Sequence, residues 1–174
     1  AGRLFSLGTA QSLTQQLPDT EQGVKRGDAL VAVVHPEPPT LALFINSTTP
    51  GRTVVSKILD GLLDYGPDLK PRPQRAENVD VSADGLTVRL KLRKNVLWHD
   101  GKPFTSADVK FSAEEVWRKH APTARRVFQH LTKVEAPDAH TVVLTLAKPT
   151  PVILNALDVV AAPVLPKHLS AGTA

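Results

Sequence analysis

The feature that most constrains the fold is a strict alternation of apolar and polar side chains between residues 86 and 93. The alternating residues are Leu86, Val88, Leu90 and Leu92 on one side and Thr87, Arg89, Lys91 and Arg93 on the other. A period of two places the two sets on opposite faces of an extended strand, which predicts a half-buried strand. Asp84-Gly85 before it is typical of a turn, and Val79 and Val81 precede that turn, so an antiparallel hairpin is predicted.

A second hairpin is predicted between residues 133 and 146. Residues 133–136 lead into the segment 137–140, which contains proline and aspartate, two residues that favour turns. After this turn Val142, Leu144 and Leu146 alternate with other residues, as they would on a strand. The two hairpins together predict antiparallel sheet.

Helices are predicted at residues 53–63, 106–119, 123–132 and, as a short helix, 151–159. The side chains of 106–119 that are expected to face the core are Val109, Ala113, Val116 and Trp117. Residues 29–34 are continuously apolar and predict a buried strand. The proline-rich residues 70–73 predict an extended connector. Helices beside antiparallel hairpins indicate an α+β fold.

The composition is that of a folded globular protein, with 41% hydrophobic and 22% charged residues among 174. There is no methionine, so Ala1 is not an initiator, and we expect that a signal peptide or another upstream segment has been removed. The absence of cysteine excludes disulfides and thiolate metal sites. Residues 1–27 are polar and without periodicity, which predicts a leader or an extended arm.

Several function classes lack the residues that they require. The net charge of +4 is mild and the basic residues are scattered among apolar ones, so nucleic-acid binding is not favoured. No two of the six histidines have the helical spacing of metal ligands, so no metal site is predicted. Neither common glycine-rich phosphate motif occurs, which leaves nucleotide binding unsupported. We expect no cofactor.

The segment 98–108 has two interpretations. His99 stands beside Asp100, a combination that general-base catalysis uses, but neighbours in a tight turn point apart and no nucleophile motif accompanies them. The alternative is a structural corner, in which an Asp-Gly pair turns the chain and a threonine and an aspartate three residues apart cap the next helix. We favour the corner, formed by Trp98, His99, Asp100, Gly101, Thr105 and Asp108.

The stretch 40–46 follows the predicted strand 29–34 and the proline-rich residues after it. Segments that leave the ends of strands carry binding groups more often than other segments do. Plain packing explains the apolar residues of this stretch equally well. A binding role and a packing role therefore both stay open.

A series of segments carries a family resemblance. Its members are Ile-Leu-Asp-Gly-Leu at 58–62, Asp-Tyr-Gly-Pro-Asp-Leu-Lys-Pro at 64–71, the residues 81–93 and 96–112, and Val-Leu-Pro-Lys-His-Leu at 164–169. In this order they resemble the family 5 extracellular solute-binding proteins, the dipeptide, oligopeptide and nickel binding components of ABC importers. Asp60 stands where the family usually has glutamate, and Arg75 to Val79 replaces a Leu-Ala-x-x-Trp element without its tryptophan.

The resemblance implies a periplasmic-binding-protein-like first lobe, with the second lobe missing from this N-terminal portion. It implies that 28–50 starts lobe I, that 51–160 is an inserted subdomain, and that 161–174 is a truncated segment returning towards lobe I. Members of the family enclose ligand between two closing lobes and make or break no bond. The residues expected to contribute to the cleft wall are Glu37, Pro38, Thr40 and Phe44.

The implied partners are a peptide or peptide-like solute and an ABC permease in the membrane. The implied location is the periplasm or the cell exterior, with or without a membrane tether, and the full-length protein is expected to be a monomer. A stand-alone interaction module without a complete ligand site is the alternative. A hydrolase is a third hypothesis, which the missing catalytic motifs disfavour.

Overall fold

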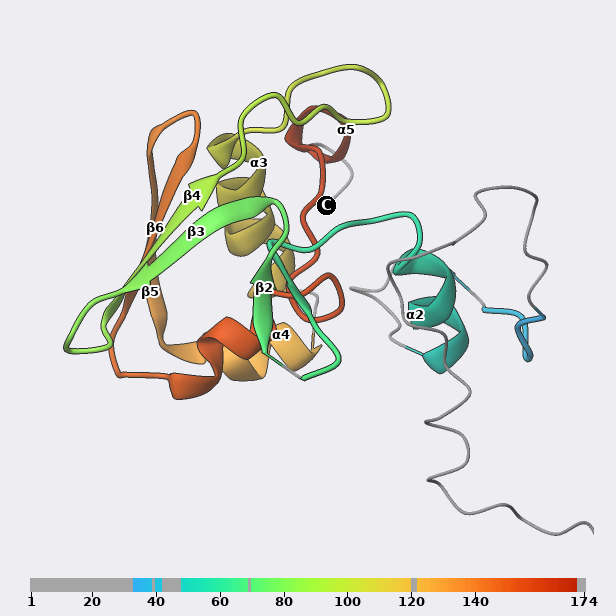
Figure 1. Cartoon of the computed structure of the whole chain (residues 1–174), viewed down its shortest axis with the longest axis horizontal. Coiled ribbons are helices and arrows are strands. Elements are labelled where there is room, and N and C mark those ends of the chain that lie inside the picture. The colour runs from blue at the N-terminus through green and yellow to red at the C-terminus, as the bar shows by residue number, and fades with distance from the viewer. Residues whose placement is uncertain (1–32, 39, 42–47, 69, 120–121, 172–174) are drawn as a thin grey trace, which may run out of the picture. The chain divides into compact units, whose positions relative to one another are not determined.

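The computed structural model describes residues 33–38, 40–41, 48–68, 70–119 and 122–171 (Figure 1). Its main sheet has four antiparallel strands in the order β3-β4-β6-β5. The strands are β3 (Ala76–Val81), β4 (Thr87–Leu92), β5 (Leu131–Asp138) and β6 (Thr141–Leu146). The pairs β3–β4 and β5–β6 are the two predicted hairpins, which are confirmed. Pairing of β4 with β6 joins the hairpins into one sheet.

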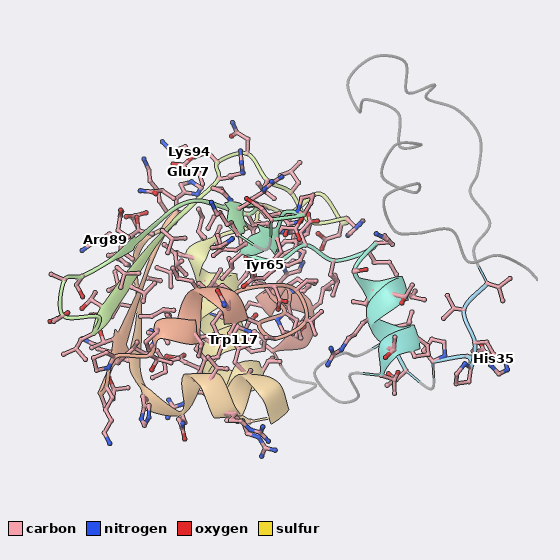
Figure 2. All side chains as sticks on the ribbon, turned by 60° about the horizontal axis from the view of Figure 1, so that its bottom comes forward. His35, Tyr65, Glu77, Arg89, Lys94 and Trp117 are labelled. Atoms are coloured by element: carbon pink, nitrogen blue, oxygen red, sulfur yellow. The ribbon has the colours of Figure 1, made fainter. Side chains whose placement is uncertain are left out.

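The side chains on one face of this sheet belong to the hydrophobic core. In β4 every second residue is fully buried, namely Val88, Leu90 and Leu92. Arg89 and Lys91 between them are exposed, so the alternation in the sequence separates a wet face from a dry one. Figure 2 shows Arg89 projecting outward from the sheet and Trp117 among the packed side chains of the helical layer.

A helix covers the dry face. It begins as α3 (Ser106–Phe111) and continues as the π-helical segment η1 (Ser112–Trp117), which confirms the helix predicted from residue 106. Val109, Ala113, Val116 and Trp117 are all buried, as predicted. The ring of Trp117 stacks on Phe128 with a centroid distance of 4.9 Å.

The helix predicted at 123–132 is shorter than expected. The helical residues are α4 (Pro122–Val127) and the 3₁₀ turn η2 (Phe128–His130), and Leu131 already belongs to β5. Leu131 is buried and pairs with Leu146 of the neighbouring strand. Sheet pairing thus overrides the helical spacing at this residue.

The helix predicted at 53–63 is also wrong in extent, because α2 spans Thr49–Val55. The backbone N–H groups of Leu62 and Leu63 donate instead to the carbonyl of Leu157, at 3.1 and 3.0 Å. A side chain at Gly61 would lie 2.6 Å from the backbone N of Val159, so only glycine allows this approach. Leu63 then starts strand β1.

Strand β1 (Leu63–Tyr65) pairs with β2 (Pro71–Pro73) in a two-stranded antiparallel ribbon. The connector predicted at 70–73 is therefore extended, but its pairing was not predicted. Helix prediction at 151–159 is confirmed for its first part, the 3₁₀ helix η3 (Pro151–Ala156). A short helix α5 (Lys167–Ser170) follows near the end of the described chain and was not predicted. The predicted leader 1–27 and residues 29–32 of the predicted buried strand lie outside the described residues. The strand prediction is wrong at Val33 and Val34, which are not in a strand, and Val33 is 92% exposed.

Candidate functional site

The residues predicted to line a ligand cleft lie in the N-terminal part of the described chain. Glu37 is exposed, and Pro38 and Thr40 are half-buried. Phe44 lies outside the described residues. A groove lined by residues between 110 and 137 and another lined by residues between 102 and 171 contain none of these side chains.

The segment 98–104 is a tight turn closed by backbone hydrogen bonds. The N–H of Trp98 donates to the carbonyl of Lys102 at 2.8 Å, and the N–H of Gly101 donates to the carbonyl of Trp98 at 2.9 Å. Gly101 has a φ of +81°, where any other residue would be strained. The buried rings of Trp98 and Phe104 pack edge to face, with centroids 5.7 Å apart. This segment is a packed corner.

His99 and Asp100 do not act on each other. His99 is exposed, whereas the Asp100 carboxylate lies 2.6 Å from Nε2 of His168 in α5. This hydrogen bond is the main cause that holds the pKa of Asp100 below its ordinary value. Since Asp100 is engaged with a histidine far along the chain, the geometry does not support general-base chemistry at His99.

Asp108 is a buried carboxylate at the start of α3, only 4% exposed. Its Oδ2 accepts a hydrogen bond from the backbone N–H of Thr105 at 2.9 Å and one from the Thr105 hydroxyl at 3.3 Å. Its Oδ1 accepts from the backbone N–H of Lys167 at 2.9 Å. Both oxygens are therefore satisfied, one by the helix start and one by the C-terminal segment.

Sequence reasoning missed two hydrogen bonds between the helix and the same C-terminal segment, those of Ser112 and Trp117. The buried Ser112 hydroxyl accepts from the backbone N–H of Leu165 at 2.9 Å. Trp117 Nε1 donates to the carbonyl of Pro163 at 2.8 Å. A signal for Ser112 was present, because a serine four residues after Asp108 lies on the same, inward face of the helix.

Among the described residues, Arg75 is another charged side chain that is buried, with 8% of its surface exposed. Its guanidinium lies 5.0 Å from the centroid of Trp98 and 5.2 Å from that of Phe104. Nη2 lies 3.4 Å from Oδ2 of Asp60, a side chain that is 56% exposed. Nε and Nη1 of Arg75 and Nε1 of Trp98 have no hydrogen-bond partner among the described residues. Arg75 is thus buried mainly against the two aromatic rings.

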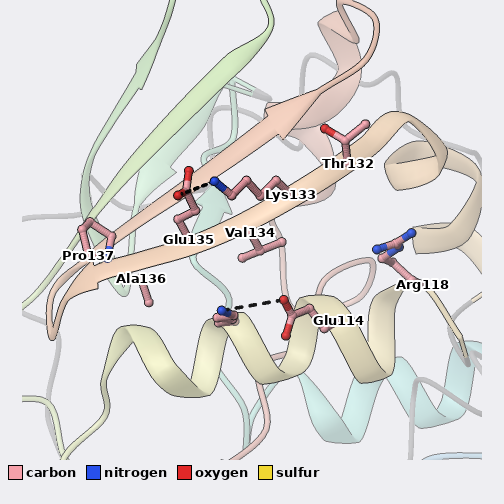
Figure 3. Close-up of a pocket in the computed structure, with 9 residues that line it drawn as sticks. Glu114, Arg118, Thr132, Lys133, Val134, Glu135, Ala136 and Pro137 are labelled. Carbon is pink, nitrogen blue, oxygen red and sulfur yellow. Dashed lines mark ion pairs between the residues drawn. The ribbon is translucent and has the colours of Figure 1, made fainter.

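A groove of about 450 Å³ runs between the edge strand β5 and the helix α3–η1 (Figure 3). The charged residues along it are mostly paired, Lys133 with Glu135 at 2.7 Å and Lys110 with Glu114 at 4.0 Å. A lining of paired charges does not offer the apolar, enclosed surroundings that small-molecule sites usually have.

Within the described ranges, no set of three or more histidine or acidic side chains is grouped so that it could hold a metal ion. In that same part of the chain, none of the helices combines the length and the apolar character that crossing a bilayer requires.

Residues 70–173 match the family described as bacterial extracellular solute-binding proteins, family 5 Middle. The glutathione-binding protein GsiB of Pectobacterium atrosepticum is 34% identical to the chain over 107 residues. These residues are 61% of this chain but only 21% of that protein. The chain thus spans about a fifth of this relative.

Comparison with solved structures agrees with the family match. NikZ from Campylobacter jejuni, in complex with Ni(L-His), is 35% identical and superposes with a TM-score of 0.62 over 68% of this chain and 24% of that one. AgaA from A. tumefaciens R10, in complex with agropinic acid, is 35% identical with a TM-score of 0.69 over 78% of this chain and 28% of that one. The described chain therefore has the fold of part of a periplasmic binding protein, about a quarter of each of these two chains.

Proposed function

Because the chain belongs to the bacterial extracellular solute-binding proteins of family 5, we propose that it is part of the solute-binding component of an ABC importer. The single observation that supports this most is the family match over residues 70–173. The proposed location is the periplasm or the cell exterior, and the proposed partner is a membrane permease of the same importer. Binding is the whole of the proposed activity, with no chemical step.

A peptide or peptide-like solute is the proposed ligand. GsiB, at 34% identity, is described as binding glutathione, which is itself a small peptide. NikZ and AgaA bind a nickel–histidine complex and agropinic acid, so relatives of similar identity accept different solutes. The pocket of each member decides its ligand, and this chain spans only part of such a protein.

In the proposed mechanism, two lobes close on the solute because the closed state makes contacts that the open state lacks. Residues 28–50 would start the first lobe, 51–160 would form a subdomain inserted in it, and 161–174 would return towards it. Glu37, Pro38, Thr40 and Phe44 are the proposed contribution of this chain to the cleft wall. Their place after an apolar segment and the exposure of Glu37 support this assignment.

Isothermal titration calorimetry with a pool of short peptides tests this proposal. A full-length version of the protein should bind saturably, and replacement of Glu37 by alanine should weaken that binding. The 174-residue chain should show no saturable heat. Absence of binding by the full-length protein to any peptide would overturn the ligand class.

A second function is supported by the core itself, in which buried residues from both hairpins and from the helix form one cluster. A subdomain with its own core can serve as a module that contacts another protein. Saturable binding of the short chain to the permease, without peptide, would favour this alternative over solute binding.

A further inference from the structure

Three buried side chains of one helix hold a single segment of backbone, the residues 163–168, here named the return strap. Asp108 accepts from the N–H of Lys167, and four residues later Ser112 accepts from the N–H of Leu165. One turn further on, Trp117 donates to the carbonyl of Pro163. The strap therefore runs antiparallel to the helix. We name the side chains of Asp108, Ser112 and Trp117 the clasp.

The clasp binds the strap through backbone groups. Asp108 is 4% exposed, and Ser112 and Trp117 are 0% exposed. A buried polar group that loses its partner is left without water as a substitute, which destabilises the structure. Changing a strap side chain leaves these bonds in place, since only proline removes a backbone N–H. The contact is thus insensitive to most substitutions in the strap.

Two clasp groups also serve their own helix. Asp108 Oδ2 accepts from the N–H of Thr105, the residue that caps α3. The Ser112 hydroxyl donates to the carbonyl of Asp108 at 2.8 Å, at the point where the helix changes from α to π geometry. A serine bonded to the carbonyl four residues earlier commonly bends a helix. The same atoms therefore orient the helix start and receive the strap.

We propose that the clasp is a conformational device, in which the first turn of α3 and the return strap become ordered together and are released together. The shared carboxylate of Asp108 carries the coupling, because its position depends on donors from both sides. Under the proposed function the strap leads the chain back towards the first lobe. In that setting, which rests on the proposed function, the clasp determines whether residues 163–168 are fixed against the helix or are released from it.

A substitution in the strap can remove one bond of the clasp and little else. Lys167 is the first residue of α5, a position where proline is accepted in a helix. Pro166 before it has φ −67° and ψ 111°, the extended backbone that a residue before proline prefers. Lys167→Pro therefore deletes the N–H that donates to Asp108, and Lys167→Ala, which keeps this N–H, is the matched control.

Amide hydrogen exchange of the 174-residue chain, resolved by residue with NMR, reads both sides of the clasp. In Lys167→Pro we expect about tenfold faster exchange at Leu165 and also at Thr105, since opening of such units is cooperative. In Lys167→Ala the exchange at both amides should match the wild type. Ser112→Ala, which alters the clasp from the helix side, should accelerate the same two amides.

Faster exchange at Leu165 alone, with Thr105 unchanged in both Lys167→Pro and Ser112→Ala, would overturn the coupling. Unchanged exchange at both amides would overturn the clasp altogether. Neither result depends on solute. Hydrogen exchange therefore tests the clasp alone, and calorimetry tests the solute-binding proposal alone.

Discussion

Asp108 and Arg75 are both buried, but they differ in how completely their charged groups are hydrogen-bonded. Asp108 has donors on both oxygens, at 2.9 Å from Thr105 and from Lys167. Arg75 is buried to a similar degree but has one ion pair at 3.4 Å with a largely exposed partner, and two of its nitrogens lack acceptors among the described residues. Burial of a charge stabilises a fold only when its partners replace water completely. We therefore expect Asp108 to raise the free energy of unfolding and Arg75 to lower it.

The sharpest test of this contrast is removal of the satisfied charge. Asp108→Ala leaves the N–H groups of Thr105 and Lys167 without their acceptor, so the free energy of unfolding should fall by about 3 kcal/mol. Urea denaturation measures this loss. Asp64→Ala, which removes an exposed carboxylate from β1, is the control and should change it by less than about 0.5 kcal/mol. A similar, small loss of unfolding free energy in both variants would show that Asp108 is no more stabilising than an exposed carboxylate.

Removal of the unsatisfied charge should have the opposite sign. Arg75→Leu places an apolar side chain beside Trp98 and Phe104 and removes the ion pair with Asp60. We expect the free energy of unfolding to rise by about 1 kcal/mol, because loss of the ring contacts is outweighed by relief of the buried charge. Arg89→Leu, on the exposed face of β4, is the control for loss of an arginine. Destabilisation specific to Arg75→Leu would mean that its unpartnered nitrogens are satisfied after all.

The smallest effect is expected at an exposed charge that is paired. The hydrogen bond from His168 lowers the pKa of Asp100 below its ordinary value of 3.8. Its stabilising contribution is therefore full above that value and is lost as the pH falls through the lower, folded-state pKa. Asp100→Asn should flatten the pH dependence of the thermal midpoint below about pH 4.

His168→Gln separates the cause of this pH dependence from the carboxylate itself. It keeps Asp100 and removes its main partner, so it should flatten the same part of the profile. Asp84 and Asp138, whose pKa values are also lowered by hydrogen bonds, should supply the slope that remains. A wild-type profile in His168→Gln would rule out His168 as the cause.

Local patterns in the sequence were sufficient for the sheet and for the main helix. The alternation in residues 86–93 predicted β4, and turn residues predicted both hairpins, because strand faces and tight turns depend on residues close in sequence. The family resemblance likewise rests on such local motifs, and the match over residues 70–173 confirms it.

Contacts between distant residues were beyond such patterns. Leu131 has helical spacing but joins a strand because Leu146 pairs with it. Leu62 leaves the predicted helix because its N–H finds the carbonyl of Leu157. The clasp joins residues up to 59 positions apart, a distance that local patterns do not reach. Its one signal in the sequence was Ser112, a polar residue on the inward face of the helix. The ligand-wall residues around Glu37 stay a prediction.

The hydrogen bonds from Leu62 and Leu63 to Leu157 determine how the two ends of the intervening segment are placed. They bring the point where the chain enters the sheet-and-helix core beside Leu157, which precedes the return strap. A segment whose two ends meet can be spliced into a surface loop of a host without stretching the host's backbone, and the entropy of closing a longer loop grows only slowly with length. The segment between Leu62 and Leu157 therefore has ends that lie close enough for it to be inserted into a longer chain.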